Sequence, residues 1–278
     1  MNNDDQIEYW NGQAGEKWVQ NSDMLDAMLA PFAERILESA ALKPGERVID
    51  IGCGAGALSL KAAAQVGDRG HVIGVDVSQP MVGLAIDRAR AAGAPASFAV
   101  HDASAYRPDT PCDALISRFG VMFFEDPGTA FAEMRKNLKP GGRMAFACWQ
   151  PLAENDWVTI PLQATLPFLT EPPIAPPPRA PGPFAFSDKE YMARFLADAG
   201  WTNVAIEGWT CPMSIPGDSL AENAAFMMEL GPSARLIAAQ KLAPEPVAAA
   251  LIKQLTELAG TDGQISLKGA VWIVTGTA

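Results

Sequence analysis

The 278-residue chain contains no apolar run near the roughly 20 residues that a membrane-spanning helix needs. Its first residues, MNNDDQIEYW, are polar and acidic and lack the basic and apolar regions of a secretory signal. Its four cysteines, Cys53, Cys112, Cys148 and Cys211, are scattered and form no CxxC pair. These absences favour a cytoplasmic protein with buried, reduced thiols.

Positive charge is also scarce. The chain has 21 Lys and Arg against 32 Asp and Glu, a net charge of −11, and no basic run. Such a chain repels phosphate backbones and anionic lipid over a Debye length of about 8 Å. Nucleic acid is therefore disfavoured as a partner, and a small molecule is expected. The helical residues 219–260 could form either a lid or the contact of a homodimer.

Residues that usually carry acid–base or metal chemistry are few. Of the two histidines, His71 opens a predicted strand at the end away from a ligand, and His101 precedes an acid at the opposite end of the next strand. No His, Cys and acid cluster has metal-ligand spacing. Neither a nucleophile elbow nor a Walker loop is present. We therefore predict no metal site and assign no catalytic residue.

What the chain does contain is an alternation of strands and helices. We predict helices in the first forty residues, interrupted at Pro31, followed by a short buried strand before residue 52. Strands over 71–77, 96–103, 112–119, 139–149, 202–215 and 269–278 alternate with helices over 57–67, 79–93, 127–138, 186–201 (with Ser187 as N-cap) and 219–260. This rhythm predicts a doubly wound α/β fold, a mainly parallel sheet with helices on both faces. The last two strands are expected to pair with each other.

The alternation breaks at residues 167–183, which contain eight prolines. Proline removes backbone donors and fixes φ, so this segment is expected to be an extended surface loop. It could be a linker at the rim of the domain or a lid over a pocket.

A bend rich in glycine follows the first strand, in the sequence VIDIGCGAGAL at 48–58. Glycine lets the backbone take unusual conformations and approach a ligand closely. Read as GxGxxA with Asp76 downstream, the bend fits a dinucleotide site. However, Asp50, Asp76 and Asp102 fall at the ends of three successive strands. Three acids there suit a cationic nucleoside better than an anionic dinucleotide.

Four segments, VIDIGCGAG, VIGVDVSQPMV, HDASAY and NLKPGGRMAF, occur in an order and spacing that resemble the class I S-adenosylmethionine (SAM)-dependent methyltransferases. The branch that includes the ubiquinone and menaquinone C-methyltransferases is most similar. The resemblance covers about residues 42–150. It implies a Rossmann-like seven-stranded sheet of order 3-2-1-4-5-7-6 with an antiparallel last strand. We expect a helical cap at 1–41 and a SAM domain at 42–278 with insertions at about 151–186 and 216–266.

The resemblance also implies where the cofactor lies. Asp76 would bind the ribose, Asp102 would lie near the adenine amino group, and backbone at Gly52, Gly54 and Ser117 would meet the methionine half. The predicted cofactor residues are Trp10, Trp18, Asp50, Gly52, Cys53, Gly54, Asp76, Val77, Met81, Asp102, Ala103 and Ser117. S-adenosylhomocysteine is the expected product.

The acceptor would lie beside the exit of the fourth strand, SRFGVMFFEDP. The predicted substrate residues are Arg118, Phe119, Phe123, Trp149 and Trp157. Arg118 could instead pair with Glu125 or Asp126, the alternative that we favour. A wider apolar roof is expected from Trp149, Trp157, Phe184, Phe186, Trp209, Met227 and Met228. Any single member could instead be core.

These patterns predict methyl transfer to a small, fairly apolar metabolite at O, N or C. Positioning alone can lower such a barrier by roughly 7–11 kcal/mol. The alternative from another class is a SAM-binding protein without methyl transfer, pericyclase-like or regulatory. An NAD-dependent oxidoreductase is a third reading, and the chain offers no well-placed Tyr–Lys or His–Asp pair for it.

Overall fold

A computed structural model describes residues 3–215, 217–260 and 264–278, and for residues 3 and 4 only the backbone. These residues form a seven-stranded sheet of order β3-β2-β1-β4-β5-β7-β6. The strands are β1 (Arg47–Ile51), β2 (His71–Asp76), β3 (Ala96–Val100), β4 (Cys112–Arg118), β5 (Leu138–Trp149), β6 (Thr202–Ser214) and β7 (Ser266–Thr277). β1 to β5 pair in parallel, and β7 runs antiparallel between β5 and β6. The predicted fold class and strand order are confirmed.

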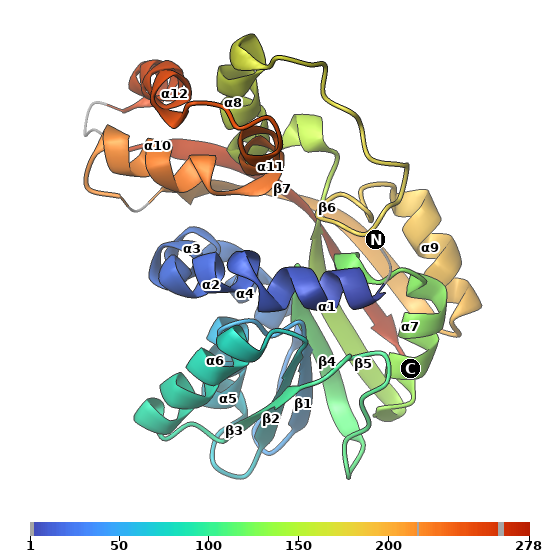
Figure 1. Cartoon of the computed structure of the whole chain (residues 1–278). Helices are drawn as coiled ribbons and strands as arrows, with labels where there is room; N and C mark the ends of the chain where they lie inside the picture. Colours follow the sequence, from blue (N-terminus) through green and yellow to red (C-terminus); the bar gives the residue numbers. More distant parts are fainter. Residues whose placement is uncertain (1–2, 216, 261–263) are drawn as a thin grey trace.

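Helices flank both faces of this sheet (Figure 1). They are α5 (Ala57–Val66), α6 (Gln79–Ala92), α7 (Pro127–Arg135) and α9 (Lys189–Asp198). Proline in the first turn and glycine after the last residue delimit α6 as expected. The N-cap of α9 differs from the prediction. Asp188, not Ser187, accepts hydrogen bonds from the backbone N–H groups of Glu190 and Tyr191. A carboxylate one residue later satisfies the same free donors of the first turn.

Residues 3–40 form four helices, where the sequence predicted a helical segment that is kinked or split into two at Pro31. They are α1 (Asn3–Asn11), α2 (Gln13–Gln20), α3 (Ser22–Met28) and α4 (Ala30–Ala40). Pro31 lies in the first turn of α4, where its missing N–H costs nothing, and this confirms the predicted break. In Figure 1 these helices lie between the sheet and a second group of helices.

The second group consists of α8 (Asp156–Thr165), α10 (Leu220–Met228), α11 (Gly231–Ala239) and α12 (Pro244–Leu258), packed against one another. Short 3₁₀ turns are η1 (Val121–Phe123), η2 (Leu152–Glu154) and η3 (Leu166–Phe168). The sequence did not predict α8, which carries Pro161 inside it. Residue 216, at the predicted start of the second insertion, and residues 261–263 within it lie outside the described residues.

The core fills the space between the sheet and its helices, with Phe32, Phe131 and Phe146 among the largest fully buried side chains. All four cysteines are buried and none forms a disulfide. Among the described residues, no helix has both the length and the apolar character needed to cross a bilayer.

Candidate functional site

A cavity of about 1250 Å³ lies at the carboxyl ends of the parallel strands. Its wall combines the glycine bend, the N-terminal helices, the exit of β4, the proline-rich loop and α11. Ligand pockets typically measure about 300–1,000 Å³, so this space is large enough for two small molecules side by side. Residues 173–185 of the proline-rich loop line it, although Ile174 remains 95% exposed.

The glycine bend forms the floor of the cavity. Gly52, Gly54 and Gly56 all have positive φ, at +64°, +53° and +84°. A side chain at Gly52 would meet the backbone of Gly120 at 2.5 Å, so glycine lets the ends of β1 and β4 touch. A Cβ at Gly54 would meet only the Met81 sulfur at 3.8 Å. This backbone therefore faces open space in which a ligand can lie against it.

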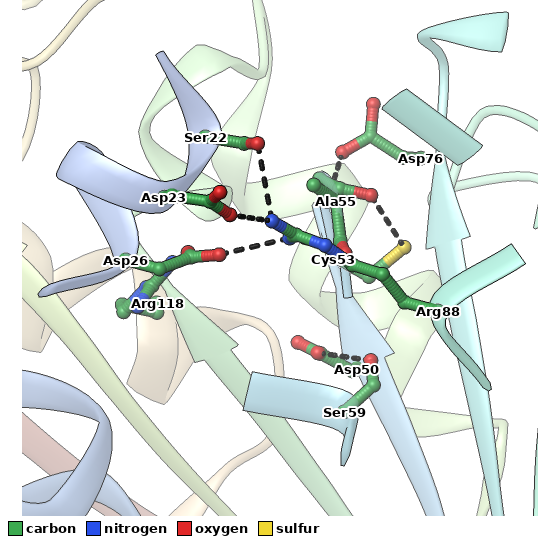
Figure 2. Close-up of polar contacts among 11 residues, drawn as sticks. Ser22, Asp23, Asp26, Asp50, Cys53, Ala55, Ser59, Asp76, Arg88 and Arg118 are labelled. Carbon is green, nitrogen blue, oxygen red and sulfur yellow. Dashed lines mark hydrogen bonds and ion pairs between the residues drawn. The ribbon is translucent and has the colours of Figure 1, made fainter. Parts of the chain in front are cut away.

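Asp50, at the end of β1, is fully buried beneath this bend. One carboxyl oxygen accepts a hydrogen bond from the Ser59 hydroxyl at 2.6 Å, and the other has no partner among the described residues (Figure 2). Burial raises the pKa of Asp50 to about 7, against the opposing effects of the Ser59 hydrogen bond and the Arg118 charge. An unpartnered buried oxygen of this kind is where a cationic ligand would gain most.

Two further acids follow on neighbouring strands. Asp76 ends β2 and accepts hydrogen bonds from the backbone N–H groups of Gly54 and Ser78, at 2.8 and 2.9 Å. Burial raises the pKa of Asp76, and these hydrogen bonds oppose the rise. Asp102 follows β3, and one of its oxygens accepts from the backbone and hydroxyl of Ser104. The structure thus brings all three predicted acids to one cavity wall.

The other predicted cofactor residues lie on the same cavity, with one exception. Trp10, Trp18, Cys53, Val77, Met81 and Ala103 line it. Ser117 is buried and does not, which departs from the prediction. Its hydroxyl donates to the Ile51 carbonyl at 2.6 Å and accepts from the Gly120 N–H at 3.3 Å. Ser117 therefore supports the contact between β1 and β4 from behind.

Aromatic rings make up another part of the cavity wall. Phe119, which has a positive φ of 65°, stacks on Trp149 with centroids 4.1 Å apart, and Trp149 packs against Trp157 at 5.0 Å. The apolar roof is smaller than predicted. Phe186, Trp209, Met227 and Met228 do not line the cavity, since they pack into or against the core. Phe184 does line it.

The N-terminal aromatic residues contact a residue that follows β4. The Trp10 ring packs edge-on against both Trp18 and Phe123, with centroids 5.7 and 5.4 Å apart. All three residues line the cavity. Trp10 and Trp18, which are predicted to contact the cofactor, thus lie on the cavity wall.

Arg118 lines the cavity, but its predicted ion pair is wrong. Its partner is Asp26 on α3, at 3.0 Å, not Glu125 or Asp126. Asp126 instead caps α7 through the Thr129 N–H. Asp26 was not predicted from the sequence, and neither was Asn11, which bridges α1 to the start of α6. The polar YWNGQ stretch around Asn11 was a usable signal; for Asp26 there was none.

The remaining candidates are unremarkable in the structure. His71 hydrogen-bonds the Ser97 hydroxyl away from the cavity. His101 lines the cavity beside Asp102, as expected from its place after β3. Across residues 3–215, 217–260 and 264–278, no group of three or more His, Cys, Asp or Glu could hold a metal ion.

Comparisons with known proteins agree with this geometry. Residues 48–142 match the family model described as "Methyltransferase domain". The chain is 33% identical over 112 residues to phosphoethanolamine N-methyltransferase 1 of Arabidopsis thaliana, covering 40% of this chain and 22% of that protein. It is 33% identical over 140 residues to the ubiquinone/menaquinone biosynthesis C-methyltransferase of Vibrio campbellii, covering 49% and 54%. The chain thus spans about half the length of these relatives or less.

Among solved structures, the [4+2]-cyclase SpnF is similar to this protein with a TM-score of 0.56 at 19% identity, covering 95% of each chain. Such a likeness shows the fold alone. The family match covers residues 48–142, and the fold likeness extends beyond it over the whole sheet. Residues 48–142 therefore match the methyltransferase domain family, within a chain whose seven-stranded sheet has the Rossmann-like strand order 3-2-1-4-5-7-6.

Proposed function

We propose that this protein is a SAM-dependent methyltransferase that methylates a small, fairly apolar acceptor. The observation that carries the proposal is one continuous cavity that is lined both by the three acids with the glycine bend and by a group of aromatic rings. A cofactor alone would not need the aromatic part of the cavity wall. The named methyltransferase relatives support the reaction class, and their names include both N- and C-methylation.

The acidic side chains around the glycine bend suit a cationic nucleoside. Asp76 and Asp102 offer carboxylate oxygens at the ends of β2 and β3, and Asp50 has a buried oxygen without a partner among the described residues. In the proposal Asp76 accepts from the ribose hydroxyls and Asp102 lies near the adenine amino group. The open space at Gly54 admits the ligand against the backbone.

Bound SAM would supply a sulfonium methyl group that an acceptor nucleophile can attack, with S-adenosylhomocysteine as the leaving group. The chain itself would hold the acceptor against the aromatic wall and keep water out. Trp10, Trp18 and Phe123 line the cavity, and Trp10 packs against the other two rings, so they are suited to close the site over both molecules. Positioning and water exclusion together suffice in principle for this reaction, and no general base is assigned.

The test is transfer from SAM carrying a labelled methyl group to the components of a metabolite extract, read by mass spectrometry. The expected result is a product heavier by one methylene, together with S-adenosylhomocysteine. Asp76→Ala should weaken SAM binding by more than about tenfold, since the ribose would lose a charged acceptor. Asp87→Ala, at an exposed acid paired with Arg90 on α6, is the matched control and should change nothing.

Two outcomes would count against the proposal. Calorimetric binding of S-adenosylhomocysteine without product from any acceptor would contradict methyl transfer while leaving the cofactor in place. An unchanged Kd in the Asp76→Ala variant would put the ribose elsewhere.

A further inference from the structure

One carboxylate in the cavity wall is shared by two arginines. Asp26, on α3, accepts from Arg88 on α6 at 2.9 Å through one oxygen and from Arg118 at the end of β4 at 3.0 Å through the other. All three side chains are largely shielded from solvent. The exposed fraction is 25% for Asp26, 22% for Arg88 and 12% for Arg118. Asp26 thereby connects the N-terminal helices to two elements of the sheet domain.

The two arginines depend on Asp26 to different degrees. Arg88 also donates to the Ala55 carbonyl, to the Ser22 hydroxyl and to Asp23, at 3.2, 3.1 and 2.7 Å (Figure 2). Within the described part of the chain, Arg118 has no other hydrogen-bonded or ion-paired side chain besides Asp26. Loss of the Asp26 charge would therefore leave Arg88 in place and release Arg118.

Arg118 occupies a distinct part of the cavity. Its strand, β4, pairs with β1, whereas Asp76 and Asp102 follow β2 and β3 on the other side of β1. If the ribose and adenine lie at β2 and β3, the amino-acid half of the cofactor falls beside β1 and β4. This step rests on the function proposed above. A zwitterion there needs an anion for its ammonium group and a cation for its carboxylate.

The ends of β1 and β4 carry one acid and one arginine, the two charges that a zwitterion requires. Asp50 supplies the acid, and Arg118 is close enough for its charge to lower the pKa of Asp50. Asp26 uses one nitrogen of the Arg118 guanidinium, which has five N–H donors in all. The remaining donors can bind a second carboxylate, and a planar guanidinium suits that geometry.

We propose that Asp26 is a positioning residue that holds Arg118 to receive the α-carboxylate of the cofactor. Asp26 contacts the guanidinium from the side of the N-terminal helices, and the ligand carboxylate binds from within the cavity. The contact of α3 with Arg118 is thereby linked to recognition of the amino-acid half of the cofactor.

The test compares two probes, S-adenosylhomocysteine and 5′-methylthioadenosine, by calorimetry on the full chain. The second probe lacks the amino-acid half. Asp26→Asn should raise the Kd of S-adenosylhomocysteine about tenfold or more, as expected for the loss of a charge-assisted contact. The Kd of 5′-methylthioadenosine should stay within about twofold on the same reasoning.

Asp23→Asn is the matched control, because Asp23 lies on the same helix and contacts the same Arg88, but its side chain is 97% exposed. It should affect neither probe. Arg118→Gln should reproduce the selective loss, and it keeps the proposal testable if Asp26→Asn does not give a cooperative melt.

Equal weakening of both probes would overturn the proposal, because it would mean that Asp26 acts on the whole cavity rather than on the carboxylate. Unchanged binding of both probes would overturn it as well. Failure of the wild-type protein to bind either probe would refute the proposed function itself, and that result is recognisable before any variant is made.

Discussion

At the residue scale, Asp50 combines a titratable group with complete burial. Its carboxyl group accepts a hydrogen bond from the Ser59 hydroxyl, and burial raises its pKa from 3.8 to about 7. The folded protein therefore binds this proton more tightly than the unfolded chain does. A group of this kind contributes stability that is complete below pH 3.8 and is lost as the pH rises through about 7.

Asp50→Asn should remove this pH dependence. In the ligand-free protein, the stability of the wild type relative to the variant should fall by about 3 kcal/mol between pH 5 and pH 8. Urea unfolding of both proteins across this range measures it. Ser59→Ala should move the change to higher pH, because it removes a hydrogen bond that lowers the pKa of Asp50. A constant difference between wild type and Asp50→Asn would show that the carboxyl does not titrate in this range.

At the element scale, α1 and α2 contact the sheet domain through polar groups at the start of α6. Asn11 donates to the Val77 carbonyl at 2.8 Å and accepts from the Gln79 N–H at 2.9 Å. The Ser78 hydroxyl donates to the Trp10 carbonyl at 2.7 Å. A side chain at Gly15 would meet that Ser78 hydroxyl at 2.9 Å, so glycine allows α2 to pack this closely.

Asn11→Ala should loosen α1 and α2 without unfolding the sheet domain. Two lost hydrogen bonds, each contributing about 1 kcal/mol, predict amide exchange in these helices about tenfold faster or more. Hydrogen–deuterium exchange of residues 5–20 against those of β1 and β4 measures this. Glu8→Ala, an exposed position on α1, is the control. Uniform acceleration across the whole chain would instead mean that Asn11 supports global stability.

At the scale of the whole molecule, binding of the cofactor should stabilise the fold. The cavity takes its wall from the N-terminal helices, the sheet and the insertion helices together, so a ligand inside it contacts elements far apart in the sequence. S-adenosylhomocysteine at 100 times its Kd should add about 2.7 kcal/mol to the free energy of unfolding. Thermal denaturation should show an increase in Tm of about 5 °C or more. NAD should give no shift, and a shift with NAD alone would overturn the assignment of the site.

The sequence by itself determined the parts of this protein that depend on local patterns. Strand and helix periodicity, the proline and glycine at the ends of α6 and the glycine bend are each set within a few residues of the chain, because backbone conformation and burial repeat locally. Asp50, Asp76 and Asp102 could be placed at one wall because parallel strands end at the same edge of a sheet. Helix α8 escaped prediction, since Pro161 obscures its helical pattern.

Only the tertiary structure decided which side chains meet across the cavity. Asp26 and Arg118 are 92 residues apart in the sequence, and Arg118 has acidic neighbours nearer in the chain that it does not contact. Only the tertiary structure likewise brings Trp10 against Phe123 and places Ser117 behind the glycine bend. It also decides which aromatic residues pack into the core instead of lining the cavity. Such contacts depend on how helices dock on the sheet, and that docking follows from packing of the whole core, which no local pattern encodes.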